Sequence, residues 1–176
     1  MRRNHYPTAH AWLWLLALLI AAMAAAAPAR GEPLVLDGQA RMLYAGGHLE
    51  RLDDTSGKLG AADVAQAAGW TTLPDSLSAG FTPAAVWLRL PVRVDRIPQG
   101  GWMLRLSNAL LDDVRVYMGQ DGYWTLLGRS GEDLPRQDWP VDYRSPVISF
   151  EPPAPGNYVI LVLSLIHISE PTRPER

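Results

Sequence analysis

Apolar and polar residues alternate along the segment from Ala85 to Met118. The apolar side chains recur at every second position in residues 85–94, 102–107 and 113–118. A period of two is typical of a β-strand with one face in the core and the other toward solvent. A shift of one residue would turn each apolar row into water, so the pattern also specifies the register. We therefore predict three neighbouring strands here, and we take them as the centre of the fold.

Further strands are predicted where short β-prone runs are bounded by turn residues. They cover residues 33–37, 123–127, 146–150 and 157–163. The turn from Gly119 to Gly122 predicts a hairpin that leads into the second of these strands. The segments 53–57 and 128–142 are polar and are predicted to be loops.

One short helix is predicted from Ala61 to Ala68. Gly60 can serve as its N-cap, and Asp63 lies in the first turn, where the helix dipole favours a negative charge. Gly69 is expected to end it. One helix among about seven short strands predicts an all-β fold, a jelly-roll-like β-sandwich.

The first 29 residues have the order of features of a secretory signal peptide. Arg2 and Arg3 precede an apolar run from Ala11 to Ala27, and a small-x-small cleavage site ends at Ala29. An uncleaved anchor is the alternative, because the run approaches the roughly 17 residues of the shortest membrane-spanning helices. The alanine-rich end of the run is weakly hydrophobic, which favours cleavage. We therefore expect export to the periplasm, with residues 30–163 as the exported domain.

The composition excludes several classes of function. The 16 Lys and Arg nearly balance the 18 Asp and Glu, whereas a nucleic-acid-binding surface needs clustered positive charge. The chain has no cysteine, which excludes disulfides, thiolate catalysis and cysteine-ligated zinc. The four histidines have neither metal-ligand spacing nor a catalytic-triad arrangement. We therefore expect no metal, no cofactor and no nucleic-acid partner.

Two acidic pairs raise the alternative of a secreted hydrolase. Glycoside hydrolysis needs two carboxyl groups that flank one bond, and Asp53-Asp54 and Glu132-Asp133 could supply them. Adjacent acidic residues in polar loops are usually only solvated. We therefore expect no catalytic residue in this chain.

A set of aromatic and polar residues on and beside the central strands forms the candidate ligand-binding site. An aromatic ring can stack on a sugar, and a guanidinium group can bind an anionic group with two hydrogen bonds. We expect most of this set to share the sheet face opposite the apolar row, with help from the adjoining loops. The candidates are Trp87, Arg89, Arg105, Asn108, Tyr117 and Arg144.

Each candidate also has a structural interpretation. Trp87 could pack under the helix, and the arginines could pair with Asp112 and Asp113 at the rim. Asn108 could cap a turn, as asparagine often does. For any single residue the structural interpretation is favoured, and both stay open at this point.

The order of several short motifs resembles a known family. Asp-Thr-x-Gly precedes the helix, and Val-Trp-Leu-Arg lies in the first central strand. Trp-x-Leu-x-Leu-x-Asn is followed by Leu-Asp-x-Val-x-Val-Tyr, and Arg-x-Pro-Val precedes the last strands. From His48 to Val162 this order resembles the second type of extracellular sensing domain of bacterial seven-transmembrane receptors with diverse intracellular signalling modules (7TMR-DISM extracellular 2).

The resemblance implies a jelly-roll sandwich, similar to carbohydrate-binding modules, that senses an unidentified small molecule or carbohydrate in the periplasm. It implies attachment to the inner membrane through helices encoded downstream. It also implies a diguanylate cyclase or histidine kinase output that is missing from the residues present, which are themselves expected to have no enzymatic activity. The alternatives are a stand-alone exported carbohydrate-binding protein and, more weakly, the secreted hydrolase.

Residues 164–176 depart from the family pattern. The string SLIHISEPTR resembles a translated sequencing-adapter tail that occurs on unrelated proteins, so we expect this segment to be non-native. The alternative is a genuine short strand with a polar tail. If the family's next strand is missing, strand 157–163 becomes an unpaired sheet edge, which natural proteins normally cover or charge. We therefore expect the chain to self-associate through this edge.

Overall fold

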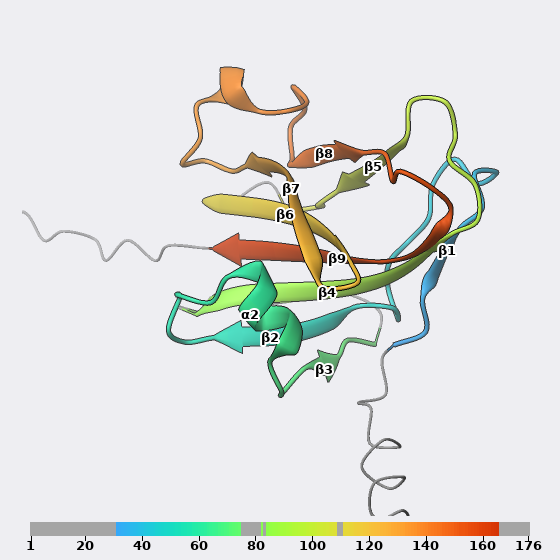
Figure 1. The fold of residues 1–176 in the computed structure, drawn as a ribbon. Helices are drawn as coiled ribbons and strands as arrows, with labels where there is room; N and C mark the ends of the chain where they lie inside the picture. Colours follow the sequence, from blue (N-terminus) through green and yellow to red (C-terminus); the bar gives the residue numbers. More distant parts are fainter. Residues whose placement is uncertain (1–30, 75–81, 83, 109–110, 166–176) are drawn as a thin grey trace, which may run out of the picture. The chain divides into compact units, whose positions relative to one another are not determined.

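The computed structural model describes residues 31–74, 82, 84–108 and 111–165. The predicted signal peptide and nearly all of the predicted non-native tail lie outside these residues. Figure 1 shows the described part as a set of strands with one short α-helix. The elements are β1 (Leu34–Leu36), β2 (Glu50–Asp54), α2 (Ala61–Gln66), β3 (Thr71–Thr72), β4 (Ala85–Val94), β5 (Trp102–Arg105), β6 (Asp113–Gln120), β7 (Tyr123–Ser130), the 3-10 helix η1 (Arg136–Asp138), β8 (Val147–Phe150) and β9 (Gly156–Leu165).

The described strands form a seven-stranded sheet and a two-stranded sheet. The large sheet has the order β3-β2-β4-β9-β6-β7, and β1 pairs in parallel with the second half of β4. The small sheet pairs β5 with β8 in antiparallel fashion. The prediction of an all-β, sandwich-like fold with one short helix is confirmed.

The apolar rows predicted from the sequence are buried between the two sheets. The row from Val86 to Val94 on β4 joins one hydrophobic cluster with Val114 and Val116 of β6 and with Ile148 of β8. Ile148, Val114 and Val116 are completely buried. The sequence pattern therefore correctly predicts which face of each of these strands is directed toward the core.

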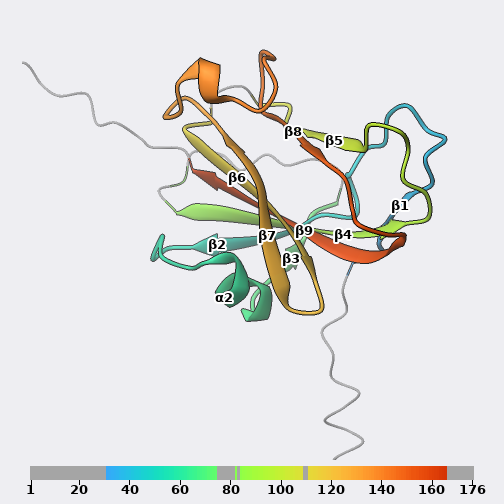
Figure 2. The ribbon, with the colours of Figure 1, turned by 45° about the horizontal axis from the view of Figure 1, so that its top comes forward.

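The opposite face of β4 is buried as well. The helix α2 places Ala61 and Val64 in a second cluster with Trp87 of β4 and Leu161 of β9. Figure 2 shows α2 on the side of the large sheet that faces away from β5 and β8. On β4 only Arg93 is exposed, so the prediction that this strand has one solvent-exposed face is wrong. The alternating pattern could not reveal that α2 covers this second face, because the residues buried there are polar as well as apolar.

The helix begins as predicted and ends two residues early. The Gly60 N–H donates a hydrogen bond to the Asp63 carboxylate at 3.2 Å, which satisfies one of the free donors at the helix N-terminus. Ala67 already has extended backbone, so the predicted last turn through Ala68 does not form. Residues Ala61 and Val64 supply the buried side of the helix.

Two observed strands have no counterpart in the sequence prediction. The strand β2 includes Asp53 and Asp54, which were predicted to lie in a loop, and β3 consists of only two threonines. Leu52 is the one apolar residue of β2, so alternation gives no signal there. The strand β7 also runs to Ser130, into the loop predicted for residues 128–142.

The strand β9 lies inside the large sheet. It pairs with β4 on one side and with β6 on the other. Ser164 is buried and lies opposite Val86 and Val114, and the Asp112 N–H donates to the Leu165 carbonyl at 3.0 Å. The prediction of an unpaired edge at residues 157–163 is therefore wrong, and self-association through it has no basis in this sheet.

Candidate functional site

The structure separates the six predicted ligand-binding residues into two groups. Trp87 and Arg89 on β4, and Tyr117 on β6, belong to the large sheet. Arg105 ends β5 in the small sheet, Asn108 follows β5, and Arg144 lies just before β8. The prediction that Arg105 shares a face with Trp87 is therefore wrong. Alternation gives the side of each strand on which a residue lies, but not the sheet that the strand joins.

Arg89 lies in the interior, where it forms an ion pair. Its Nε donates to Glu50 Oε2 at 2.5 Å, and both side chains are less than one-tenth exposed. Glu50 lies directly opposite Arg89 in the β2–β4 pairing. The guanidinium carbon also lies 4.2 Å from the centre of the Trp70 ring, a cation–π geometry. The prediction of an exposed Arg89 is therefore wrong.

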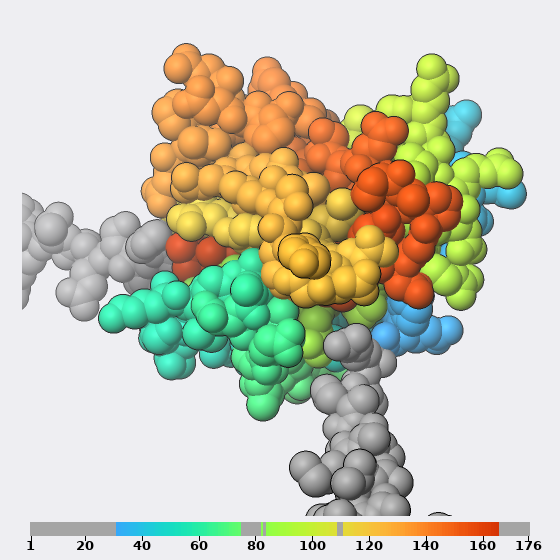
Figure 3. All heavy atoms as spheres, in the orientation of Figure 1, coloured from blue at the N-terminus to red at the C-terminus, as the bar shows by residue number. Residues whose placement is uncertain are grey.

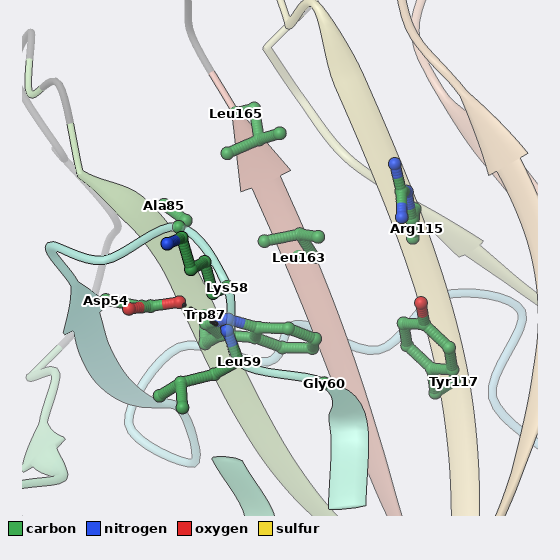
Figure 4. Close-up of a pocket in the computed structure, with 11 residues that line it drawn as sticks. Asp54, Lys58, Leu59, Gly60, Ala85, Trp87, Arg115, Tyr117, Leu163 and Leu165 are labelled. Atoms are coloured by element: carbon green, nitrogen blue, oxygen red, sulfur yellow. Dashed lines mark hydrogen bonds between the residues drawn. The ribbon is translucent and has the colours of Figure 1, made fainter. Parts of the chain in front are cut away.

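A pocket of about 240 Å³ opens beside Trp87. One wall is the loop from β2 to α2, and the other is formed by the ends of β4, β9 and β6 (Figure 4). In Figure 3 atoms at the end of β9 are visible between this loop and β6, in the same region. The pocket brings together Trp87 and Tyr117 from the candidate set, with Leu163 and Leu165 beside them.

The aromatic side of this pocket carries an unpartnered donor. The Trp87 and Tyr117 ring centres are 6.0 Å apart, with 33° between the ring planes. The Trp87 Nε1 is buried and has no hydrogen-bond partner among the described residues. Buried indole N–H groups normally find a partner. Trp70 and Trp102 have unpartnered nitrogens too, but neither lines this pocket.

Cationic groups line the same pocket. Lys58, the only lysine of the chain, is exposed at its rim. Arg115 extends from β6, with its Nη2 2.7 Å from Asp113 Oδ2, and 38% of its side chain is exposed. The hydrogen bond with Asp113 raises the pKa of Arg115, and the Tyr117 hydroxyl acts in the same direction. Asp113 is shared, because Arg129 also pairs with it at 3.3 Å. The predicted pairing of a rim arginine with Asp113 is thus confirmed.

Lys58 and Arg115 are not among the six residues predicted to bind ligand. A signal for Lys58 does exist, because it follows directly on the Asp-Thr-x-Gly motif that begins with Asp54. For Arg115 the sequence predicts only the strand face on which the residue lies, and it gives no signal for a pocket.

Asp54 holds the loop that forms one wall of the pocket. Its carboxylate accepts hydrogen bonds from the Ser56 N–H and the Leu59 N–H, both at 2.9 Å, and from the Ser56 hydroxyl. Burial by itself would raise the pKa of Asp54, but the bonds from Ser56, Leu59 and Gly57 outweigh it and hold the pKa below its ordinary value. Asp53 is instead exposed and pairs with Arg51 at 2.7 Å. The two carboxyl groups therefore do not flank one cleft.

Replacing Asp54 with Asn is expected to lower the free energy of unfolding at neutral pH by about 1–3 kcal/mol, because buried N–H donors lose a charged acceptor. The folded-state pKa is depressed, so this contribution is complete above the ordinary value of 3.8 and is lost as the pH falls through the lower folded value. Urea unfolding of wild type and variant at pH 7 and pH 3 measures the loss of stability and its dependence on pH. The difference in free energy of unfolding between wild type and Asp54→Asn should be smaller at pH 3 than at pH 7. A gap that stays constant would contradict this account of the loop.

Residues 46–168 match the model of the family described as 7TMR-DISM extracellular 2. The chain belongs to this family. The resemblance drawn from the short motifs is confirmed, and the pocket beside Trp87 lies within the matched residues. Membership identifies the chain as carrying an extracellular-type sensor domain of membrane receptors and indicates a periplasmic location. No curated protein matches the chain.

Within residues 31–74, 82, 84–108 and 111–165, no helix is long and apolar enough to cross a membrane. Over the same residues, no group of three or more histidine, aspartate or glutamate side chains is arranged to hold a metal ion.

Proposed function

We propose that this 7TMR-DISM extracellular 2 domain is a periplasmic ligand-sensing domain, and that the pocket beside Trp87 takes the ligand. The observation that carries the proposal is the buried, unpartnered Nε1 of Trp87, a residue that lines a pocket together with Lys58 and Arg115. Unpaired buried donors are costly, and a ligand acceptor would satisfy this one. The output, a diguanylate cyclase or histidine kinase, would lie outside the described residues.

The lining favours a small, oxygen-rich ligand such as a sugar. Tyr117 provides apolar ring surface, and a sugar ring can pack on such surface while its hydroxyl groups bind polar atoms. Lys58 and Arg115 donate hydrogen bonds and carry positive charge, which would favour a sugar with an acidic substituent. A volume of about 240 Å³ suits a ligand of one or two rings better than a polymer.

Trp87→Phe is expected to weaken ligand binding by about tenfold, because it removes the indole N–H while it keeps an aromatic ring in the core. Tyr117→Phe and Lys58→Met should weaken binding by a similar factor or less. The measurement is isothermal titration of the full chain with a panel of neutral sugars, sugar acids and amino acids, following the compound that gives the strongest heat.

Trp102→Phe is the matched control. Its indole nitrogen is equally unpartnered but lies outside the pocket, so this variant should bind like wild type. Equal ligand affinity of wild type and Trp87→Phe, with both proteins folded, would show that the ligand does not bind in this pocket. An equal loss of ligand affinity in Trp87→Phe and Trp102→Phe would lead to the same conclusion.

A further inference from the structure

A second depression lies in the small sheet and shares no lining residue with the pocket beside Trp87. Its volume is about 340 Å³, and it is lined by Arg105, Ser107, Arg144 and Ser145. Arg105 pairs with Val147, and the Leu106 N–H donates to the Pro146 carbonyl at 3.0 Å. The antiparallel register thus continues past the end of β5.

This continued register explains why residues far apart in the sequence meet here. Ser107 follows Leu106, Ser145 precedes Pro146, and both line the depression together with Arg105 and Arg144. Two of the six residues singled out in the sequence (Arg105 and Arg144) therefore gather at one end of the small sheet.

Among the described residues, no acidic side chain forms an ion pair with either arginine of this depression. Six other described arginines form ion pairs with aspartate or glutamate. Arg105 and Arg144 form none with the described residues, and the Arg144 guanidinium carbon lies 6.0 Å from the centre of the Tyr143 ring. Arg41 and Arg96 also lack such an ion pair but do not line this depression. Two unpaired guanidinium groups in one depression repel each other, and an anion between them would relieve this repulsion.

The loop before Arg144 is braced by contacts of its own. Arg136 lies over the Trp139 ring at 4.2 Å, pairs with Asp142 at 3.0 Å and donates to the Tyr143 carbonyl. The Trp139 Nε1 in turn donates to the Leu134 carbonyl at 3.1 Å. On the other side of Arg144, Ser145 is only 4% exposed. Arg144 is thus held between fixed neighbours, and such preorganisation lowers the entropy lost on binding.

We propose that Arg105 and Arg144 form an anion-binding site for a small soluble ligand with a carboxylate or phosphate group. A guanidinium group binds either anion with two parallel hydrogen bonds, and the hydroxyls of Ser107 and Ser145 can donate further ones. The depression is larger than one oxyanion needs, so the ligand class is a small organic anion such as a sugar acid or a sugar phosphate. This site is independent of the ligand pocket beside Trp87.

The test is isothermal titration of the full chain with glucuronate, glucose 6-phosphate and glucose. In the Trp87→Phe variant, where the other pocket is weakened, the two anionic sugars should bind and glucose should not. Arg105→Gln and Arg144→Gln should each weaken the binding of the anions by about tenfold or more, because each removes a charge-assisted hydrogen-bonding group. Arg144→Lys keeps the charge but loses the two-pronged geometry, so it should fall between Arg144→Gln and wild type.

Arg41→Gln is the matched control, because it removes the same charge from an exposed residue without an ion pair. Trp87→Phe separates the two proposals, because binding in the pocket beside Trp87 should weaken in this variant, whereas the anion binding that depends on Arg105 and Arg144 should remain. The proposal is overturned if neither anionic sugar binds, if glucose binds to Trp87→Phe as well as the anionic sugars do, or if Arg41→Gln and Arg144→Gln weaken anion binding alike. Binding only to vesicles that contain phosphatidylglycerol would overturn it too, because it would indicate a membrane surface as the partner.

Discussion

Arg89→Met is expected to lower the free energy of unfolding by about 3–5 kcal/mol, because it leaves the Glu50 carboxylate buried without its partner. The Glu50 side chain is only 3% exposed, so water cannot replace the lost guanidinium. The Met side chain still fills much of the space under Trp70, and the loss therefore reports the charge more than a cavity. Urea unfolding followed by tryptophan fluorescence measures the change.

A second arginine of the same strand provides the matched control. Arg93 pairs with Asp95 at 3.0 Å, but about half of each side chain is exposed. Arg93→Met should therefore cost at most about 1 kcal/mol. The double variant Arg89→Met with Glu50→Leu should recover most of the lost stability, because a buried pair can often be replaced by apolar residues. Equal losses for Arg89→Met and Arg93→Met would refute the special role of the buried pair.

Much of the fold could be predicted from local pattern alone. The side that each residue takes on β4, β5 and β6 follows from period two, because one apolar row must be buried whatever the strands pair with. The hairpin between β6 and β7 follows from the turn at Gly119 to Gly122, and Gly60 marks the start of α2. These features depend only on neighbouring residues in the sequence.

The unpredicted features depend on distant residues. The polar strand β2 forms because β4 lies beside it and Arg89 supplies a partner for Glu50. The strand β9 is central because β4 and β6 both pair with it, and its own residues would suit an edge or a centre equally well. No local signal states which strands will be neighbours.

The candidate site shows the same division. Trp87 and Tyr117 line one pocket, and Trp87 also packs under α2, as its structural interpretation held. The two interpretations are compatible, because one face of an indole can pack in the core while its edge lines a pocket. Arg105 and Arg144 lie in a different depression, because the chain crosses from the large sheet to the small one between β4 and β5.

Trp87→Ala is expected to lower the free energy of unfolding by about 3–5 kcal/mol, the range for removing a large buried side chain. Trp87 is 1% exposed and forms the centre of the cluster in which Val64 of α2 meets Leu161 of β9. The resulting cavity would lie directly under α2, a helix of only 6 residues. So short a helix depends on packing for its stability, and we expect α2 to loosen before the sheets do. Hydrogen exchange of the Val64 and Ala67 amides measures this local step.

Trp139→Ala is the control for this last variant. Trp139 is partly buried and belongs to neither hydrophobic cluster, so its replacement should disturb the loop before β8 and cost clearly less than the loss of Trp87. The comparison with Trp87→Phe then separates stability from ligand binding. Trp87→Phe should retain most of the stability and lose the N–H, whereas Trp87→Ala should lose both. A loss below about 1 kcal/mol for Trp87→Ala would show that the α2 face does not depend on this indole.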